Sequence, residues 1–319
     1  MRVTSNRRRL AVLSGVAALA AAGTYLLPSA NASESASSDK AGSGASMKEV
    51  WKEDFNGQAG SKPSGDNWIF DKGHGYPGGA DNWGTGEVQE YTDNKDNVQL
   101  DGDGHLKITA LKNGDTWTSS RLETKRTDFA APKGGKMRIE ASLKLPELSG
   151  DEAAGYWPAF WTLGDAFRGN YKNWPQVGEF DAMENVNGTD STYGTLHCGV
   201  ENGGPCKETQ GIGKEHKCTD ACKDFHKYAI ELDRTKADEE LRWYVDGQLF
   251  NTVKKSDVGD DKAWADATDH GHFILLNLAM GGAFPDGVAG KKTPTDATKS
   301  GGSMSVDYVS VESTGGASK

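Results

Sequence analysis

Positive charge is scarce in this sequence. Its 319 residues include 36 Lys and Arg against 46 Asp and Glu, a formal net charge of −10. Four of the arginines, Arg2 and Arg7–Arg9, lie in the first 32 residues, which contain no acid, so residues 33–319 carry −14. An acidic surface repels phosphate and sulfate groups. The charge therefore argues against nucleic acids and anionic polysaccharides as partners.

Long apolar runs are equally scarce. The main one, Leu10–Leu27, follows the arginines and precedes Ala30-Asn31-Ala32, a small-x-small cleavage pattern. Residues 1–32 are therefore expected to be a secretory signal peptide, and the paired arginines also suit a twin-arginine export route. A membrane anchor is the alternative, but no basic stop-transfer cluster follows the run. We expect a secreted, extracellular protein that does not bind membranes.

Cysteine is limited to four residues within a 25-residue stretch, and none of them forms a Cys-x-x-Cys pair. The spacing disfavours a zinc site, while export favours two disulfides with three possible connectivities. Pairing of sequence neighbours predicts Cys198 with Cys206 and Cys218 with Cys222.

A sustained helical stripe is also missing, and there is no internal repeat or second binding domain. Short segments instead alternate apolar and polar residues between turns rich in Gly, Asp, Asn and Pro, which is the strand period. After a flexible lead at 33–47, a single domain at 48–314 is expected, then a disordered tail at 315–319. We predict an all-β fold of two antiparallel sheets, with its first and last strands in one sheet. The segments are 48–55, 105–111, 136–145, 157–163, 191–200, 225–232, 241–245, 248–253, 272–280 and 304–312.

Three carboxylates stand within six residues of one predicted strand, at Glu179, Asp181 and Glu184. Alternation puts the first two on one face and the third on the other. A β-bulge at Ala182-Met183 would return Glu184 to the shared face. Crowded carboxylates cannot all ionise easily, so at least one pKa should rise, which suits glycosidic bond cleavage. Acids that merely alternate on a solvated strand edge are the alternative.

The chain resembles glycoside hydrolase family 16 from about residue 49 to 312. The segments that carry this resemblance are Gly155–Gly164 (GYWPAFWTLG), Asn173–Glu184 (NWPQVGEFDAME), Gly84–Asp93, Phe225–Glu231, Arg242–Gly247, Leu275–Gly282 and Val306–Val309. The resemblance implies a concanavalin A-like jelly roll with a concave substrate cleft. It also implies a retaining mechanism, with Glu179 as nucleophile, Glu184 as acid/base and Asp181 orienting Glu179. No cofactor is implied for catalysis.

The substrate is narrowed by the extra residue Met183. In the family this spacing indicates a β-1,3-linked backbone, so we expect a secreted endo-1,3-β-glucanase acting on a neutral, laminarin-like polysaccharide as a monomer. β-1,3-Galactan stays open, because the cysteine segment resembles loops of some galactan-cutting relatives and should form one wall of the cleft. A mixed-linkage β-glucanase, a wall-remodelling transglycosylase and a lectin that lost turnover also stay open.

Aromatic and polar residues around the acids are candidate substrate contacts. Exposed indoles stack on the apolar faces of sugar rings, whereas Trp51, Trp68 and Trp243 are expected in the core. A neutral His197 could hydrogen-bond Glu184 or the substrate, or be a core histidine. Asn277 interrupts an apolar run and either faces the cleft or binds backbone. The full set of candidates is Trp157, Trp161, Trp174, Glu87, Tyr91, His197 and Asn277.

Two places in the sequence invite a metal ion. His270 and His272 share a strand face but have no cysteine nearby in sequence, and a structural or surface role is favoured over a metal site. The resemblance implies a structural calcium held by Asp54, Gly104 and Asp307, since calcium prefers oxygen ligands. At this place the sequence has Glu53-Asp54, the reverse of the Asp-Glu order that is usual in the family.

Overall fold

The computed structural model describes residues 46–218, 220 and 222–314. The predicted signal peptide at 1–32, most of the lead at 33–47 and the tail at 315–319 lie outside this part of the chain. Across the described ranges, no helix is long and apolar enough to cross a membrane.

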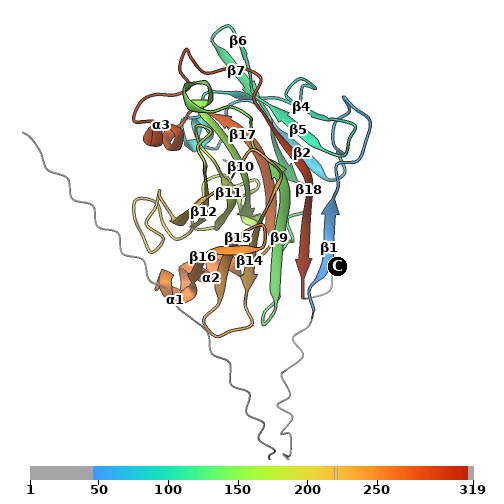
Figure 1. The fold of residues 1–319 in the computed structure, drawn as a ribbon. Coiled ribbons are helices and arrows are strands. Elements are labelled where there is room, and N and C mark those ends of the chain that lie inside the picture. Colours follow the sequence, from blue (N-terminus) through green and yellow to red (C-terminus); the bar gives the residue numbers. More distant parts are fainter. Residues whose placement is uncertain (1–45, 219, 221, 315–319) are drawn as a thin grey trace, which may run out of the picture. The chain divides into compact units, whose positions relative to one another are not determined.

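The strands assemble into two large antiparallel sheets, as predicted (Figure 1). The eight-stranded sheet has the order β16-β15-β14-β9-β18-β5-β4, with β1 added beside β18. Its strands are β1 Lys48–Glu53, β4 Val98–Leu100, β5 Leu106–Thr109, β9 Lys136–Lys144, β14 His226–Asp233, β15 Glu240–Val245, β16 Gln248–Lys254 and β18 Ser303–Ser313. The pairing of β1 with β18 confirms that the first and last strands of the domain share a sheet.

The seven-stranded sheet has the order β13-β12-β11-β10-β17-β8-β2. Its strands are β2 Trp68–Asp71, β8 Arg121–Thr124, β10 Tyr156–Gly164, β11 Glu179–Glu184, β12 Ser191–His197, β13 Ile212–Lys217 and β17 His272–Met280. Every residue of β17 is buried, which explains its nearly unbroken apolar run. Figure 1 shows β10, β11, β12 and β17 side by side. A small third sheet holds β3 Glu90–Tyr91, β6 Leu111–Asn113 and β7 Thr116–Ser119.

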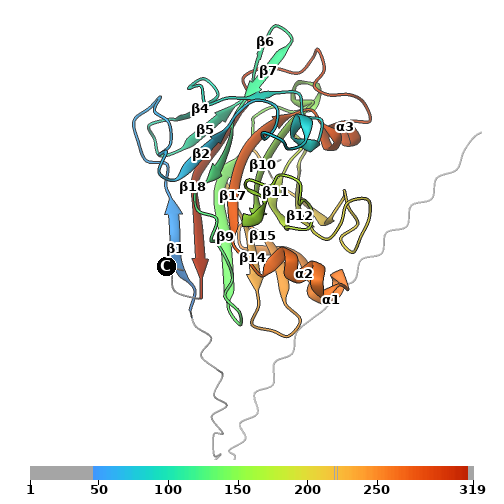
Figure 2. The same cartoon turned by 180° about the vertical axis from the view of Figure 1, so that it is seen from behind.

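Helices are short, in agreement with the missing helical stripe. They are α1 Lys255–Val258, α2 Asp261–Thr268, α3 Ala283–Ala289 and the 3₁₀ turns η1 Asp81–Gly84, η2 Gly150–Ala153 and η3 Asp165–Phe167. The side chain of Asp260 caps α2 by accepting from the backbone N–H groups of Lys262 and Ala263. Seen from both sides, α3 lies at one end of the strands and α1 and α2 lie at the other (Figures 1 and 2).

The core between the sheets holds the tryptophans predicted for it. Trp68 and Trp243 are fully buried, and Trp51 packs edge-on against Trp68 with ring centroids 5.9 Å apart. Both predicted disulfides, Cys198–Cys206 and Cys218–Cys222, are present. The first closes the loop between β12 and β13.

Candidate active site

The strand β11 contains the bulge that the acidic spacing predicts. Against β12, Asp181 pairs with Thr195 and Glu184 pairs with Tyr193, so Ala182 and Met183 together face Gly194. The pairing with β10 shifts at the same place. Both bulge side chains are buried. As a result Glu179, Asp181 and Glu184 all line one cleft.

A core tryptophan supports the bulge from beneath. The indole Nε1 of Trp243 donates a 2.7 Å hydrogen bond to the backbone carbonyl of Asp181. Gly194 makes room for this ring, because a Cβ there would lie 2.4 Å from Cδ1 of Trp243. The glycine opposite the bulge is therefore required by packing, and sequence reasoning assigned it no role.

The cleft has a volume of about 1200 Å³ and runs over β8, β10, β11, β12 and β17. Aromatic side chains form much of its lining, which suits a sugar chain whose rings expose apolar faces. These include Tyr76, Trp83, Trp157, Trp161, Tyr171 and Trp174. The phenol rings of Tyr76 and Tyr171 stack with centroids 4.2 Å apart.

Two indoles donate hydrogen bonds to the first and last acids. Trp157 Nε1 lies 2.9 Å from Glu184 Oε1, and Trp174 Nε1 lies 3.0 Å from Glu179 Oε2. Both tryptophans were predicted to contact substrate. They line the cleft, and their N–H groups also orient the two carboxylates.

Glu179 and Glu184 have raised pKa values, as crowding predicts. Burial and the neighbouring Asp181 carboxylate raise the pKa of Glu184 to about 8. Burial and the same neighbour raise the pKa of Glu179 well above its ordinary value, while the charge of His197 acts in the opposite direction. The site therefore retains at least one proton at neutral pH, which a general acid needs.

His197 lies beside the acids, but its contacts differ from the predicted ones. Its Nδ1 is 2.7 Å from Glu208 Oε2, and its Nε2 is 3.3 Å from Asp181 Oδ2 and 3.9 Å from Glu179 Oε1. Burial disfavours the imidazolium, but hydrogen bonds with Asp181 and Glu208 outweigh burial and raise the pKa of His197 well above its ordinary value. The predicted hydrogen bond to Glu184 is therefore not the one that His197 makes.

A buried chain of hydrogen bonds holds Trp161 in place. Its Nε1 donates to Asn277 Oδ1 at 2.7 Å, Asn277 Nδ2 donates to the Tyr91 hydroxyl at 3.0 Å, and that hydroxyl donates to Glu87 Oε2 at 3.0 Å. Trp161, Asn277 and Glu87 line the cleft. Tyr91 is fully buried, which corrects its assignment as a substrate contact. Its hydroxyl links two cleft residues instead.

Sequence reasoning missed Arg121, which lines the cleft from β8. Its guanidinium lies 4.6 Å from the ring centroid of Trp83 and 4.9 Å from that of Trp161. Nε of Arg121 donates to Asp71 Oδ2 at 3.0 Å. The one available signal was a charged residue within a short alternating segment, which by itself does not distinguish a cleft from a surface.

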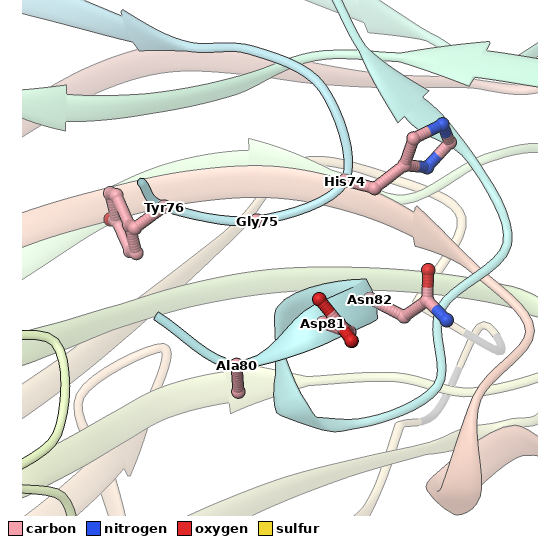
Figure 3. Close-up of a pocket in the computed structure, with 6 residues that line it drawn as sticks. All are labelled: His74, Gly75, Tyr76, Ala80, Asp81 and Asn82. Atoms are coloured by element: carbon pink, nitrogen blue, oxygen red, sulfur yellow. The ribbon is translucent and has the colours of Figure 1, made fainter. Parts of the chain in front are cut away.

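A smaller pocket of about 370 Å³ lies where the 74–76 loop meets η1 (Figure 3). His74, Asp81 and Asn82 line it, and Tyr76 and Ala80 line both this pocket and the large cleft. It is therefore a side pocket of the cleft.

The paired histidines have structural partners. Buried His272 donates from Nε2 to the Ala267 carbonyl at 3.0 Å and accepts at Nδ1 from the Thr162 hydroxyl at 3.1 Å. Burial, with the neighbouring His270, lowers the pKa of His272 to about 3. His270 Nε2 lies 2.7 Å from the Asp266 carbonyl. These contacts favour the structural role over a metal site.

The residues expected to hold calcium do not fit it as they stand. Asp54 Oδ1 lies 2.6 Å from Lys52 Nζ. Hydrogen bonding to Asp54, with a weaker contribution from Asp307, raises the pKa of Lys52. The ammonium group of Lys52 already pairs with Asp54, so a cation here would have to displace it.

A cleft lined by aromatic rings, with three converging carboxylates of which at least one stays protonated, defines a glycoside hydrolase. The chain belongs to the glycosyl hydrolases family 16, whose family model matches residues 85–309. The solved endo-1,3-β-glucanase of Streptomyces sioyaensis is 51% identical, with a TM-score of 0.81 over 84% of this chain and 96% of that one. This agreement confirms the predicted jelly roll.

Two curated relatives are more distant. The β-glucanase of Rhodothermus marinus is 32% identical, over 82% of this chain and 84% of its own length. Glucan endo-1,3-β-glucosidase A1 of Niallia circulans is 30% identical over 84% of this chain, but the match spans only 38% of that longer protein.

Proposed function

We propose that this protein is an endo-acting, retaining hydrolase that cleaves internal β-1,3 linkages of a neutral β-1,3-glucan. The observation that carries the proposal is the bulge at Ala182 and Met183, which brings Glu184 into the same cleft as Glu179. The similarity to the Streptomyces sioyaensis endo-1,3-β-glucanase supports the choice of linkage.

Glu179 and Glu184 have complementary roles in this proposal. Glu184, with a pKa of about 8, is protonated at neutral pH and gives its proton to the departing glycosidic oxygen while a Glu179 carboxylate oxygen bonds to the anomeric carbon. Glu184 then takes a proton from water, the water oxygen bonds to the anomeric carbon, and Glu179 is released. The N–H of Trp174 and the positive charge of His197 favour the ionised form that Glu179 needs.

β-1,3-Galactan is the alternative substrate with a specific observation in its favour. Thr209, Gln210 and Gly211, which follow the Cys198–Cys206 loop, line the cleft and can influence which sugar fits. Transglycosylation and sugar binding without cleavage are further outcomes that the same experiment distinguishes.

Several accompanying properties are proposed with the activity. The protein is secreted after removal of residues 1–32 and acts as a monomer. A structural calcium at Asp54, Gly104 and Asp307 would replace the Lys52 contact. A melting temperature raised by calcium chloride and lowered by a chelator would reveal such a site.

The test is to incubate purified protein with laminarin, mixed-linkage β-glucan, β-1,3-galactan and agarose, and to size the products. Short oligosaccharides from laminarin are the expected result. NMR should show that their new reducing ends are released first as the β-anomer. Cleavage of galactan with intact laminarin would select the alternative. Binding without cleavage of any polymer would refute hydrolysis.

Variants of the two acids test their roles. Glu184→Gln should lower kcat on laminarin by about 10²- to 10⁴-fold, and Glu179→Gln should lower it at least as much. The matched control is Glu140→Gln, because Glu140 pairs with Arg138 on β9 of the other sheet. A Glu179→Gln enzyme close to wild-type activity would contradict the nucleophile assignment.

A further inference from the structure

Glu208 is a buried carboxylate with two partners at the edge of the active site. Its side chain is fully buried in the segment between β12 and β13. Its Oε1 accepts a 2.9 Å hydrogen bond from the backbone N–H of Cys198, and its Oε2 lies 2.7 Å from Nδ1 of His197. Both contacts are made to the end of β12, which pairs with the catalytic strand.

The backbone of Glu208 is held as firmly as its side chain. Gly203 and Glu208 exchange two backbone hydrogen bonds, of 2.6 and 2.7 Å. Two residues before Glu208, Cys206 forms its disulfide with Cys198, the residue after His197. The disulfide and the two backbone hydrogen bonds together close a small loop that presents Glu208 to the imidazole.

The opposite edge of the imidazole ring, at Nε2, contacts the catalytic acids. Nε2 of His197 lies 3.3 Å from Asp181 Oδ2 and 3.9 Å from Glu179 Oε1. The Oδ2 atom of Asp181 is buried, and among the described residues it has no hydrogen-bond partner besides this contact with His197. A neutral imidazole has one N–H and can serve one carboxylate, whereas an imidazolium has two and can serve both sides.

We propose that Glu208 is a positioning residue for the hydrolysis: it holds His197 as an imidazolium against Asp181 and Glu179, and the Cys198–Cys206 disulfide holds Glu208 in place. The inference rests on the proposed function, since it concerns how the nucleophile stays ionised. A cation in this place is needed because burial and the Asp181, Glu184 and Glu208 carboxylates all favour a protonated Glu179, so Glu208 favours the ionised nucleophile only through His197.

In the described part of the chain, the charged groups in contact with His197 belong to β11 and to the segment after the Cys198–Cys206 disulfide. β11 contributes Glu179 and Asp181, with Glu184 farther along the strand, and the disulfide loop contributes Glu208. The ring of Trp174 packs beside the imidazole, with centroids 5.6 Å apart, and carries no charge. Removing Glu208 leaves His197 with carboxylates on one side only.

The first measurement is the titration of His197 by NMR in the wild-type protein, assigned by the signal that disappears in His197→Asn. An imidazolium that persists through neutral pH is expected. A neutral His197 at pH 7 would overturn the proposal, and this result needs neither activity nor a variant at Glu208.

The second measurement uses Glu208→Gln, which keeps the shape and the acceptor for the Cys198 N–H. Loss of an opposite charge at this distance should lower the pKa of His197 by about 1 to 3 units. Because the imidazolium would then be lost before Glu184 gives up its own proton, the basic limb of the pH profile of kcat/KM on laminarin should move to lower pH. A uniform loss of activity at every pH, with unchanged His197 titration, would mean that Glu208 only supports the loop.

The role of the disulfide is tested by the double variant Cys198→Ser/Cys206→Ser, which should also lower the pKa of His197. In this double variant, Glu208→Gln should lower the pKa of His197 by less than it does in the wild type, because both changes act through the contact between Glu208 and His197. The matched controls are Cys218→Ser/Cys222→Ser and Glu140→Gln, which should leave the His197 titration unchanged. Full additivity would refute the role of the disulfide.

A failure of this inference can be told apart from a failure of the proposed function. If the wild type cleaves no polysaccharide, the substrate assignment fails, while the His197 titrations still report on Glu208. If laminarin is cleaved and Glu208→Gln leaves both the titration and the pH profile unchanged, only the positioning role fails.

Discussion

The indole Nε1 of Trp157 donates a 2.9 Å hydrogen bond to Oε1 of Glu184, the proposed acid/base. This bond favours the ionised carboxylate and so opposes the burial and the Asp181 charge that together raise the pKa of Glu184 to about 8. The tryptophan therefore acts on the proton that the reaction transfers as well as on the sugar.

Trp157→Phe keeps an aromatic ring but removes this donor. The pKa of Glu184 should then rise, so the basic limb of kcat/KM against pH should move upward by roughly one unit, the equivalent of one ordinary hydrogen bond. Trp161→Phe, whose N–H bonds Asn277 instead, should leave the limb in place. A limb that stays fixed or moves to lower pH in Trp157→Phe would refute this effect.

Asn277→Leu should loosen Trp161. The substitution leaves the N–H of Trp161 without its acceptor, while the Tyr91 hydroxyl loses one donor but still donates to Glu87. An unpaired buried donor costs about 1 to 3 kcal/mol, so the melting temperature should fall and KM for laminarin should rise. Asn97→Leu, at a buried asparagine that donates to Thr109 and Thr118 and does not line the cleft, is the comparison that should lower stability without raising KM. An unchanged KM in Asn277→Leu would show that Trp161 needs no such support.

Gly194→Ala should disturb the bulge through the core. The added methyl group would lie 2.4 Å from Cδ1 of Trp243, the ring that holds the Asp181 carbonyl. Overpacking of this kind costs about 1 to 3 kcal/mol, and kcat should fall together with the melting temperature. Gly65→Ala, where a Cβ meets open space, is the control. Wild-type kcat in Gly194→Ala would mean that the bulge tolerates movement of Trp243.

Acid stability should depend on Asp233 in the eight-stranded sheet. Burial opposes its ionisation, but hydrogen bonds from Thr235 and Lys136 outweigh burial and hold its pKa below the ordinary value, and Arg242 also pairs with it. A depressed pKa contributes stability above the unfolded value of about 3.9, and this contribution is lost as pH falls through the folded pKa.

Asp233→Asn should therefore melt below the wild type at pH 7, and the difference should shrink as the pH falls below about 4. Melting curves from pH 2 to 8 provide the measurement. Asp261→Asn, at a side chain that is 89% exposed, should follow the wild type throughout. A difference between Asp233→Asn and wild type that grows on acidification would contradict the sign of the argument.

Local patterns in the sequence were enough for several features of the site. Glu179, Asp181 and Glu184, spaced i, i+2, i+5, can lie on one face of a strand only if the strand contains one extra residue. The structure has that residue in the bulge. Cysteines close in sequence paired with each other, because short loops keep them within reach. Alternation was also sufficient to locate most strands of both sheets.

Other features depend on residues that the chain brings together from far apart. Arg121 reaches Trp161 because β8 and β10 flank β17 in one sheet, and it reaches Trp83 because η1 lies over the same part of the cleft. Tyr91 is buried beneath the cleft rather than exposed in it, because Asn277 of β17 covers its hydroxyl. No periodic pattern in one segment contains this information.

By itself the sequence determined the strand pattern, the kinked acidic strand and the family, because these depend on side-chain alternation and on residues close in the chain. Tertiary structure alone decided which groups set the charge of the acids. His197 faces Glu208 on one side and Asp181 on the other because a cross-linked loop folds back over the sheet. Protonation depends on distance in space and on burial, and neither can be read from the order of residues.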